Sequence, residues 1–393
     1  MNKLAIYGGE PVRKKKIPLC MPWFGPEEIK NAAQVIASGK VGGNGKFGRK
    51  CEEILSVRLK SKYALLTTSC TSALELAIMA LGIGAGDEVI APSFSFVSTA
   101  NAVVRQGARI RFVDIEPFTF NIDAGLIEKN ITKKTKAIIV VHYGGQSAEM
   151  DKIAKIAQKY NLKIIEDAAH AIGAKYKNKF LGTIGDIGCF SFHETKNLSC
   201  GEGGALLTNS PKIAKKVEIM REKGTNRSKF LRGEVDKYTW VDIGSSYVIS
   251  DILAAIILPQ LQKMDKINNL RTKNAMYLYS KLYKYQNKIT LPHLDNNNNR
   301  KSNWHIFSIR VPSKKRDQII AALNAEGISA SFHFLPLHNS PFMKKFFYKK
   351  GAMLPVTQVT SDTLIRLPLY AQMKKSDLDD IIAAVKKTIT HLL

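Results

Sequence analysis

A lysine and an aspartate, 29 positions apart, carry complementary chemistry. Lys196 lies among apolar and small residues in segment 188–197 (GCFSFHETKN), and Asp167 follows the apolar run 162–166. A lysine amine forms a Schiff base with an aldehyde, and a carboxylate keeps a ring nitrogen protonated through a charge-assisted hydrogen bond. An enzyme that uses pyridoxal 5'-phosphate (PLP) needs both groups, because the protonated ring withdraws electrons from the reacting carbon.

Each residue of this pair also has an ordinary structural explanation. An aspartate at the end of a strand caps a following helix, here one that would begin at Ala168. Lys196 alone is one lysine among many. The glycine pair Gly203 and Gly204 shortly after it permits close backbone approach. Taken together, these features favour a cofactor site.

A phosphate needs hydrogen-bond donors, and segment 67–74 (TTSCTSAL) offers hydroxyls and free amides at the start of a helix. The same residues also suit plain N-capping. With Lys196 and Asp167 present, we predict that the amides of Cys70 and Thr71 bind the phosphate. Ser191, five residues before Lys196, is expected to add a hydroxyl.

Aromatic residues near two strand ends are candidates for the faces of the ring. Phe94 and Phe96 alternate, so we expect them to share one face of an extended segment and one of them to stack on the ring. His170, three residues after Asp167, is predicted to meet the phenolic oxygen or cover the ring. No ligand spacing indicates a metal site.

The elements that must position these residues alternate between strand-like and helical patterns. The strand-like runs are residues 63–67, 88–91, 109–113, 137–141, 162–166, 188–193 and 205–208. Apolar residues at helical spacing occupy residues 72–81, 97–106, 123–130 and 150–160. This alternation predicts an α/β fold, a mainly parallel seven-stranded sheet with helices on both faces. Ligands bind beyond the carboxyl ends of such strands, where the candidate residues lie.

The second half of the chain has a different pattern of predicted secondary structure. Residues 223–248 lack periodicity and are expected to form a long ordered loop. Helices are predicted at 249–264 and 266–285, followed by a strand, a helix and a strand at 305–311, 317–326 and 328–334. A chain of 393 residues exceeds the usual size of one core. We therefore predict a large PLP-binding domain with an N-terminal arm, residues 1–260, and a small C-terminal α+β domain, residues 261–393.

Composition restricts the class of protein. Hydrophobic residues make up 45% and charged residues 23%, as in ordinary globular proteins. No apolar run reaches the roughly 20 residues that cross a bilayer, and the start lacks a signal peptide, so we expect a cytoplasmic protein without a membrane partner. The five cysteines form no CxxC pair, which favours reduced thiols. The net charge of +26 is scattered, which favours solvated lysines over nucleic-acid binding.

These residues, in this order, resemble the DegT/DnrJ family of sugar-nucleotide aminotransferases. The likeness covers nearly the whole chain and is carried by segments 4–13 (LAIYGGEPVR), 84–90 (GAGDEVI), 166–170 (EDAAH), 191–197 (SFHETKN) and 334–338 (FLPLH). Within the family it is strongest to the transaminases that form dTDP-4-amino-4,6-dideoxygalactose. The segments that carry this closer likeness are 192–197 (FHETKN), 221–228 (REKGTNRS), 235–240 (VDKYTW) and 242–247 (DIGSSY).

The resemblance implies the aspartate aminotransferase-like fold, PLP fold type I, and the transfer of an amino group from L-glutamate to C4 of dTDP-4-dehydro-6-deoxy-D-glucose. Pyridoxamine 5'-phosphate is the intermediate form of the cofactor. The product would be a dTDP-4-amino-4,6-dideoxyhexose for O-antigen or another surface polysaccharide. The galacto configuration is favoured and the gluco configuration remains open.

The resemblance also implies a role for each candidate residue. Lys196 binds the cofactor covalently and moves the proton, Asp167 meets the pyridine nitrogen, His170 the phenolic oxygen, and Phe96 the ring face. Cys70, Thr71 and Ser191 lie at the phosphate. His333 and His338 are expected to contact substrate. The active sites are shared across a homodimer, so that the 223–248 loop enters the neighbouring site.

This chain departs from the family pattern at two positions. Many family members carry an asparagine where this chain has Ser246, so Ser246 or Asn226 is expected to take its place at the partner's phosphate. His170 stands where the most similar relatives have glutamine; both side chains form hydrogen bonds.

Three alternatives stay open. A PLP-dependent dehydratase of this fold would carry histidine in place of Lys196. An aminotransferase acting at C3 of the 3-keto isomer would differ only in its product. A basic, non-catalytic binding protein would show salt-sensitive binding to nucleic acid and no response to glutamate.

Overall fold

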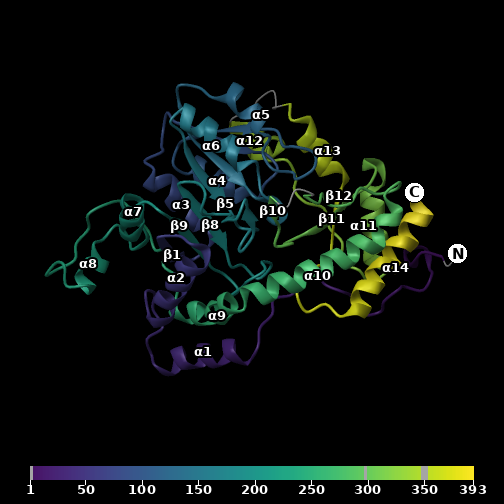
Figure 1. Ribbon diagram of the computed structural model, residues 1–393, viewed down its shortest axis with the longest axis horizontal. Helices are drawn as coiled ribbons and strands as arrows, with labels where there is room; N and C mark the ends of the chain where they lie inside the picture. Colours follow the sequence, from purple (N-terminus) through teal and green to yellow (C-terminus); the bar gives the residue numbers. More distant parts are fainter. Residues whose placement is uncertain (1–2, 296–298, 347–352) are drawn as a thin grey trace.

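The computed structural model describes residues 3–295, 299–346 and 353–393 (Figure 1). At its centre is a seven-stranded sheet of order β1-β9-β8-β5-β4-β2-β3. Its strands are β1 (Tyr63–Thr67), β2 (Glu88–Pro92), β3 (Arg109–Val113), β4 (Thr135–Val141), β5 (Lys163–Asp167), β8 (Ile187–Ser191) and β9 (Gly204–Thr208). All neighbours from β8 to β3 are parallel, and β9 runs antiparallel to β1 and β8. The predicted α/β fold is confirmed, with each strand within two residues of its expected range.

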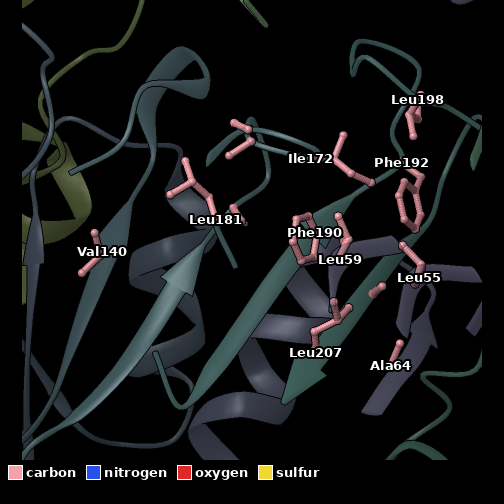
Figure 2. Close-up of a cluster of buried hydrophobic side chains, with 14 of the residues drawn as sticks. Leu55, Leu59, Ala64, Val140, Ile172, Leu181, Phe190, Phe192, Leu198 and Leu207 are labelled. Atoms are coloured by element: carbon pink, nitrogen blue, oxygen red, sulfur yellow. The ribbon is translucent and has the colours of Figure 1, made fainter. Parts of the chain in front are cut away.

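Side chains of the sheet alternate between two cores, because successive residues of a strand point to opposite faces. In β4, Ile138 and Val140 join one cluster, whereas Ala137 and Ile139 join the other. Figure 2 shows part of the first cluster, where Phe190 and Leu207 lie beside helix residues such as Leu55. Burial on both faces explains why these strands read as continuous apolar runs.

Helices cover both faces of the sheet. The first cluster takes side chains from α2 (Lys46–Leu59), α5 (Ala124–Ile127), α6 (Met150–Lys159) and α9 (Asp251–Gln262). The second takes side chains from α3 (Cys70–Ala80), α4 (Val97–Val104) and α7 (Pro211–Arg221). α1 (Pro26–Ala37) packs on α9. None of the described helices combines the length and the apolar character needed to cross a membrane.

The chain after residue 264 builds a further core. It contains α10 (Met264–Leu282), β11 (Phe307–Arg310), α11 (Arg316–Ala325), β12 (Leu364–Leu367) and α14 (Lys375–Leu392). α10 extends from the large sheet toward this core, which lies near both chain termini (Figure 1). The remaining elements are α12 (Pro341–Phe346), α13 (Pro355–Thr363) and a small sheet of β6 (Lys175–Tyr176), β7 (Lys179–Phe180) and β10 (Arg300–Lys301). The division at residue 260 stays a prediction.

The strand predicted at 328–334 is wrong. Only isolated bridges occur there, from Ile328 to Ile17 and from Ser331 to Arg366. β12 pairs instead with β11 along four residues, so the edge that the 328–334 segment would have used is already occupied over most of its length. The segment leaves the sheet and carries His333 and Phe334 toward the active-site cavity.

The 223–248 loop projects from the body together with the short helix α8 (Arg227–Leu231), as Figure 1 shows. Its base is fixed, because the backbone of Gly224 packs so closely on Asp242 that a Cβ would lie 1.7 Å from the carbonyl oxygen. Large apolar side chains of the loop face outward, with Trp240 78% and Ile243 65% exposed. The loop is ordered at its base and presents an apolar surface.

Candidate active site

One cavity of about 590 Å³ collects most of the predicted residues at the carboxyl ends of the parallel strands. Those that line it are Cys70, Thr71, Phe96, Asp167, His170, Ser191, Lys196 and His333. They come from α3, the start of α4, the ends of β5 and β8, and the segment before β12. The long distance in sequence between Lys196 and Asp167 is therefore closed in space.

Asp167 ends β5 and is held on both carboxylate oxygens. Oδ2 accepts a 2.7 Å hydrogen bond from the hydroxyl of Thr99, and Oδ1 accepts one of 3.2 Å from the amide of Ala169. Thr99 is bonded in turn to Ser95 at 2.7 Å. Burial raises the pKa of Asp167, while these donors and the charge of Lys196 oppose the rise. The carboxylate keeps lone pairs for one further cationic donor.

The strand end that carries Asp167 is braced by its neighbour Glu166, which points to the opposite face. The fully buried Glu166 carboxylate accepts from the amides of Gly182 and Gly185 and from His142 Nε2 at 2.8 Å. The amide of His142 also donates to the carbonyl of Asp167 at 3.1 Å. The two adjacent carboxylates thus have different roles: Glu166 stabilises the fold, and Asp167 faces the cavity.

Lys196 lies in a turn after β8, where its amide donates to the carbonyl of His193 at 2.9 Å. Burial lowers the pKa of Lys196 to about 8, while Cys70 and Asp167 act in the opposite direction. At neutral pH about one amine in ten is then uncharged, compared with fewer than one in a thousand for an ordinary lysine. A neutral amine is the form that attacks a carbonyl and accepts a proton.

The start of α3 has the geometry of an anion-binding site. Its N-cap Ser69 engages the amides of Ser72 and Ala73, so the amides of Cys70 and Thr71 have no acceptor among the described residues. Gly204 lies so close that a Cβ would be 2.4 Å from the carbonyl carbon of Ser69. Only glycine permits this approach of β9 to the helix start. Such free amides, with the helix dipole, favour phosphate.

Hydroxyls surround the same helix start. Thr71 Oγ1 bonds to Ser98 Oγ at 2.7 Å, and both residues line the cavity. Ser191 Oγ accepts from the amide of His193 at 3.4 Å and also lines it. Cys70 is buried, which raises its pKa well above the usual range, so it offers its amide and a neutral thiol.

His170 has a defined tautomer. Its Nδ1 accepts from the amide of Gly144 at 3.3 Å, so Nε2 carries the proton and acts as a donor. Burial, with the charges of Lys196 and Arg366, holds the pKa of His170 well below its usual range. The ring packs against His305, with centroids 4.3 Å apart and the ring planes tilted by 32°. A neutral histidine of this tautomer suits a phenolic oxygen.

Phe94 and Phe96 do not share one face as expected. Phe94 is fully buried against Phe120 and Tyr143. Phe96 is the N-cap of α4 and stays 58% exposed on the wall of the cavity. The backbone bends between them instead of running as a strand, so one ring is buried and the other exposed, although both pack against Phe334. Phe96 is the one available to a flat ring.

Three predicted residues lie outside the cavity. His338 is buried, with Nδ1 2.7 Å from Ser93 Oγ, so this arrangement gives no support to substrate contact. Asn226 caps α8 and accepts from the amide of Thr239 at 2.7 Å. Ser246 is exposed and bridged to Glu222. The expected action of Asn226 and Ser246 across a dimer interface stays a prediction.

Several other residues of the site were not predicted from the sequence: four that line the cavity, and Thr99 behind them. Thr99, Ser95 and Ser98 hold or flank predicted residues, and His305 and Arg366 come from the C-terminal part. Ser95 lies between the two aromatic residues Phe94 and Phe96, and Ser98 and Thr99 follow them on the same segment, a signal that was present. Arg366 and His305 had no local signal, because each lies more than 100 residues from Lys196. Within the described residues, no group of three or more Cys, His, Asp or Glu is arranged for a metal.

The cavity suits PLP. The free amides of Cys70 and Thr71 match its phosphate, Asp167 its ring nitrogen, His170 its phenolic oxygen and Phe96 a ring face. Lys196 supplies an amine whose lowered pKa suits a covalent link to the aldehyde. When bound, PLP supplies the electron sink for amino-group transfer.

Comparison with known proteins gives a consistent result. The family model described as "DegT/DnrJ/EryC1/StrS aminotransferase family" matches residues 23–386. Spore coat polysaccharide biosynthesis protein SpsC of Bacillus subtilis is 35% identical over 385 residues, 96% of this chain and 98% of that protein.

Solved structures agree. PseC of Helicobacter pylori, an aminotransferase involved in the biosynthesis of pseudoaminic acid, has a TM-score of 0.88 and 28% identity, covering 96% of this chain and all of that one. The PLP form of the putative sugar aminotransferase Spr1654 of Streptococcus pneumoniae has a TM-score of 0.88 and 26% identity, covering 96% and 100%. Spr1654 is also known in a PMP form.

Proposed function

The chain belongs to the DegT/DnrJ/EryC1/StrS aminotransferase family of PLP-dependent enzymes, and from that premise we propose that it aminates a nucleotide-linked ketosugar. The proposed donor is L-glutamate, and the proposed acceptor carbon is C4 of dTDP-4-dehydro-6-deoxy-D-glucose. The observation that carries the proposal is the convergence of Lys196, Asp167 and the free amides of Cys70 and Thr71 in one cavity. Sequence likeness in the 221–247 segments supports the choice of sugar.

Each residue of the site has its own proposed role in the reaction. Lys196 Nζ, about one-tenth neutral at pH 7, would move the proton between the reacting carbon of the cofactor and the substrate carbon, taking it from the donor in the first half-reaction and delivering it to the sugar carbon in the second. Asp167, fixed by Thr99 and Ala169, holds the positive charge of the ring nitrogen. His170 Nε2 donates to the phenolic oxygen. Phe96 limits water on one side of the ring.

We also propose a homodimer with shared active sites. The 223–248 loop exposes Phe230, Leu231, Tyr238, Trp240, Val241 and Ile243 on one projecting segment. Exposed apolar side chains gathered on one segment mark an interaction site. A partner subunit would bury it and bring Asn226 and Ser246 within reach of the neighbouring phosphate.

The names of the relatives support a role in sugar and surface polysaccharide synthesis. SpsC is named for spore coat polysaccharide, and PseC for pseudoaminic acid. On that basis we propose that the aminated sugar enters a surface polysaccharide such as O-antigen, and that the enzyme acts in the cytoplasm.

One experiment tests the proposal directly. Holoenzyme is incubated with L-glutamate and dTDP-4-dehydro-6-deoxy-D-glucose, and the product is analysed by NMR for the aminated carbon and its configuration. We expect an axial amine at C4. Amination at C3 of the isomeric 3-keto sugar would replace the proposed substrate. No glutamate-dependent change in cofactor absorbance, together with salt-sensitive binding to nucleic acid, would identify a non-catalytic protein.

A further inference from the structure

A second groove of about 590 Å³ lies outside the active site. It is lined by residues of the 117–120 segment after β3, by residues between 279 and 294 at the end of α10 and beyond it, and by Ser308 and Arg310 of β11. No described residue lines both this groove and the active-site cavity. Its volume is in the range of small-molecule binding sites. The PLP site therefore leaves this groove unexplained.

Arg310 places an unpaired guanidinium in the groove. Burial lowers the pKa of Arg310, and no neighbouring charge acts in the opposite direction. The guanidinium lies 5.6 Å from the ring centroid of Phe120, and among the described residues it has no hydrogen-bond or ion-pair partner. No described aspartate or glutamate lines the groove. A half-buried cation without an acid beside it favours an anionic ligand.

Aromatic side chains from two parts of the chain line the same groove. Phe118 is 61% exposed, and its ring lies tilted against His293 with centroids 5.8 Å apart. Tyr279 and Tyr283 are neighbours on the other segment, with centroids 6.1 Å apart, and Tyr283 is half exposed. Accessible rings of this kind offer flat faces to a planar group.

We propose that this groove binds a nucleotide, with Arg310 on a phosphate and Phe118 stacked on the base. A guanidinium forms paired hydrogen bonds with phosphate oxygens, and aromatic rings stack on bases of every kind. A nucleoside diphosphate uses both features of the groove. A simple anion would leave the aromatic rings exposed, and an uncharged sugar would leave Arg310 unpaired.

The groove is separated from the active site by one layer of side chains. Phe120, the ring beside Arg310, packs against Tyr143 with centroids 5.7 Å apart. The hydroxyl of Tyr143 lies 3.0 Å from Nδ1 of His333, which lines the active-site cavity. The inference goes beyond the proposed function, because the nucleotide in the groove is a second ligand and not the sugar substrate.

Calorimetry of the holoenzyme with deoxythymidine diphosphate (dTDP) tests the inference. Wild type should bind one more dTDP per chain than Arg310→Gln, whether or not the active site also binds dTDP. We expect the affinity of the groove to fall about 10- to 100-fold in Arg310→Gln, as when a hydrogen bond to a charged group is lost. Phe118→Ala should weaken the same binding event about tenfold through loss of stacking. Phe118 is exposed, so this variant should fold like wild type.

Arg316→Gln is the matched control. Its guanidinium also lies near an aromatic ring, 5.8 Å from the centroid of Phe332, but it pairs with Asp317 at 2.8 Å and does not line the groove. It should bind dTDP like wild type. Inorganic pyrophosphate separates the two parts of the ligand: it should bind more weakly than dTDP, lose binding in Arg310→Gln and keep it in Phe118→Ala.

Amide hydrogen exchange shows where the second dTDP binds. Exchange in residues 115–120 and 286–294 should slow with dTDP in wild type and Arg316→Gln, but not in Arg310→Gln. The inference is overturned if these segments stay unprotected in wild type, or if Arg310→Gln keeps the affinity within about threefold. Pyrophosphate that binds as tightly as dTDP would overturn the assignment to a nucleotide. A failure of amino-group transfer refutes the proposed function alone, because binding in the groove is measured without turnover.

Discussion

Replacing Thr99 with valine tests how the cavity keeps Asp167 charged. The Thr99 hydroxyl donates a 2.7 Å hydrogen bond to Asp167 Oδ2, and both residues are buried. Valine has nearly the same shape and no hydroxyl. A hydrogen bond to a charged group contributes about 2 kcal/mol. Its loss should raise the pKa of Asp167 further, because the hydrogen bond from Thr99 opposes the effect of burial.

The sign of the pH effect follows from that rise. Burial already raises the pKa of Asp167, and loss of the Thr99 donor adds to that rise. Without PLP, the carboxyl of the variant is therefore protonated at a higher pH than that of wild type. PLP requires the charged form at its ring nitrogen, and binding must then remove a proton. We expect the PLP dissociation constant of Thr99→Val to exceed that of wild type by up to about 30-fold, since 1.4 kcal/mol is tenfold. The ratio should grow as pH falls, because the variant carboxyl is protonated before that of wild type.

The assay is titration of the apoprotein with PLP at three pH values, reported as the ratio of variant to wild type. Thr357→Val is the matched control, because Thr357 Oγ1 donates a 2.7 Å hydrogen bond to the buried Asp114, away from the cavity. It should lower the free energy of unfolding without changing PLP affinity. A ratio near one for Thr99→Val at every pH, or an equal loss of affinity in Thr357→Val, would refute the reasoning.

Three further predictions concern other parts of the site. Covalent capture of PLP by the apoprotein should accelerate as pH rises and level off above about 8, because the lowered pKa of Lys196 sets the neutral fraction; a rise that continues to pH 10 in stopped-flow absorbance would contradict this. Gly204→Ala should weaken PLP binding and lower the free energy of unfolding by about 1–3 kcal/mol in urea titrations, since the new Cβ would lie 2.6 Å from the amide nitrogen of Cys70. Gly42→Ala is the control and should change neither quantity, because no atom lies within 4 Å of its Cβ position. Trp240→Asp should dissociate the proposed dimer in sedimentation analysis and reduce turnover, because it places a charge on the exposed apolar loop; an unchanged sedimentation coefficient would rule out this face as the interface.

The local sequence pattern was sufficient to predict the strands of the large sheet. A buried parallel strand such as 137–141 is a short apolar run bounded by helical patterns, so its limits are visible in the sequence. The residues at their ends were located for the same reason, since topology brings the carboxyl ends of parallel strands to one edge. Lys196, Asp167 and Ser191 were found this way.

Features that depend on distant pairing could not be predicted. The 328–334 segment has the composition of a strand, but β12 had already taken the available edge of β11. His338 is close in sequence to His333, and only packing on Ser93 removes it from the cavity. Arg366 is an ordinary strand arginine until the fold places it opposite Lys196 without a counter-ion.

Helix α4 joins three parts of the cofactor site through its first turn. Phe96 caps it and faces the cavity, Ser98 bonds to Thr71 at the proposed phosphate site, and Thr99 bonds to Asp167, the proposed partner of the ring nitrogen. These contacts share one rigid segment, so they are gained or lost together. Binding of PLP should therefore stabilise these contacts together, and amide hydrogen exchange along the whole of α4 should slow when PLP binds.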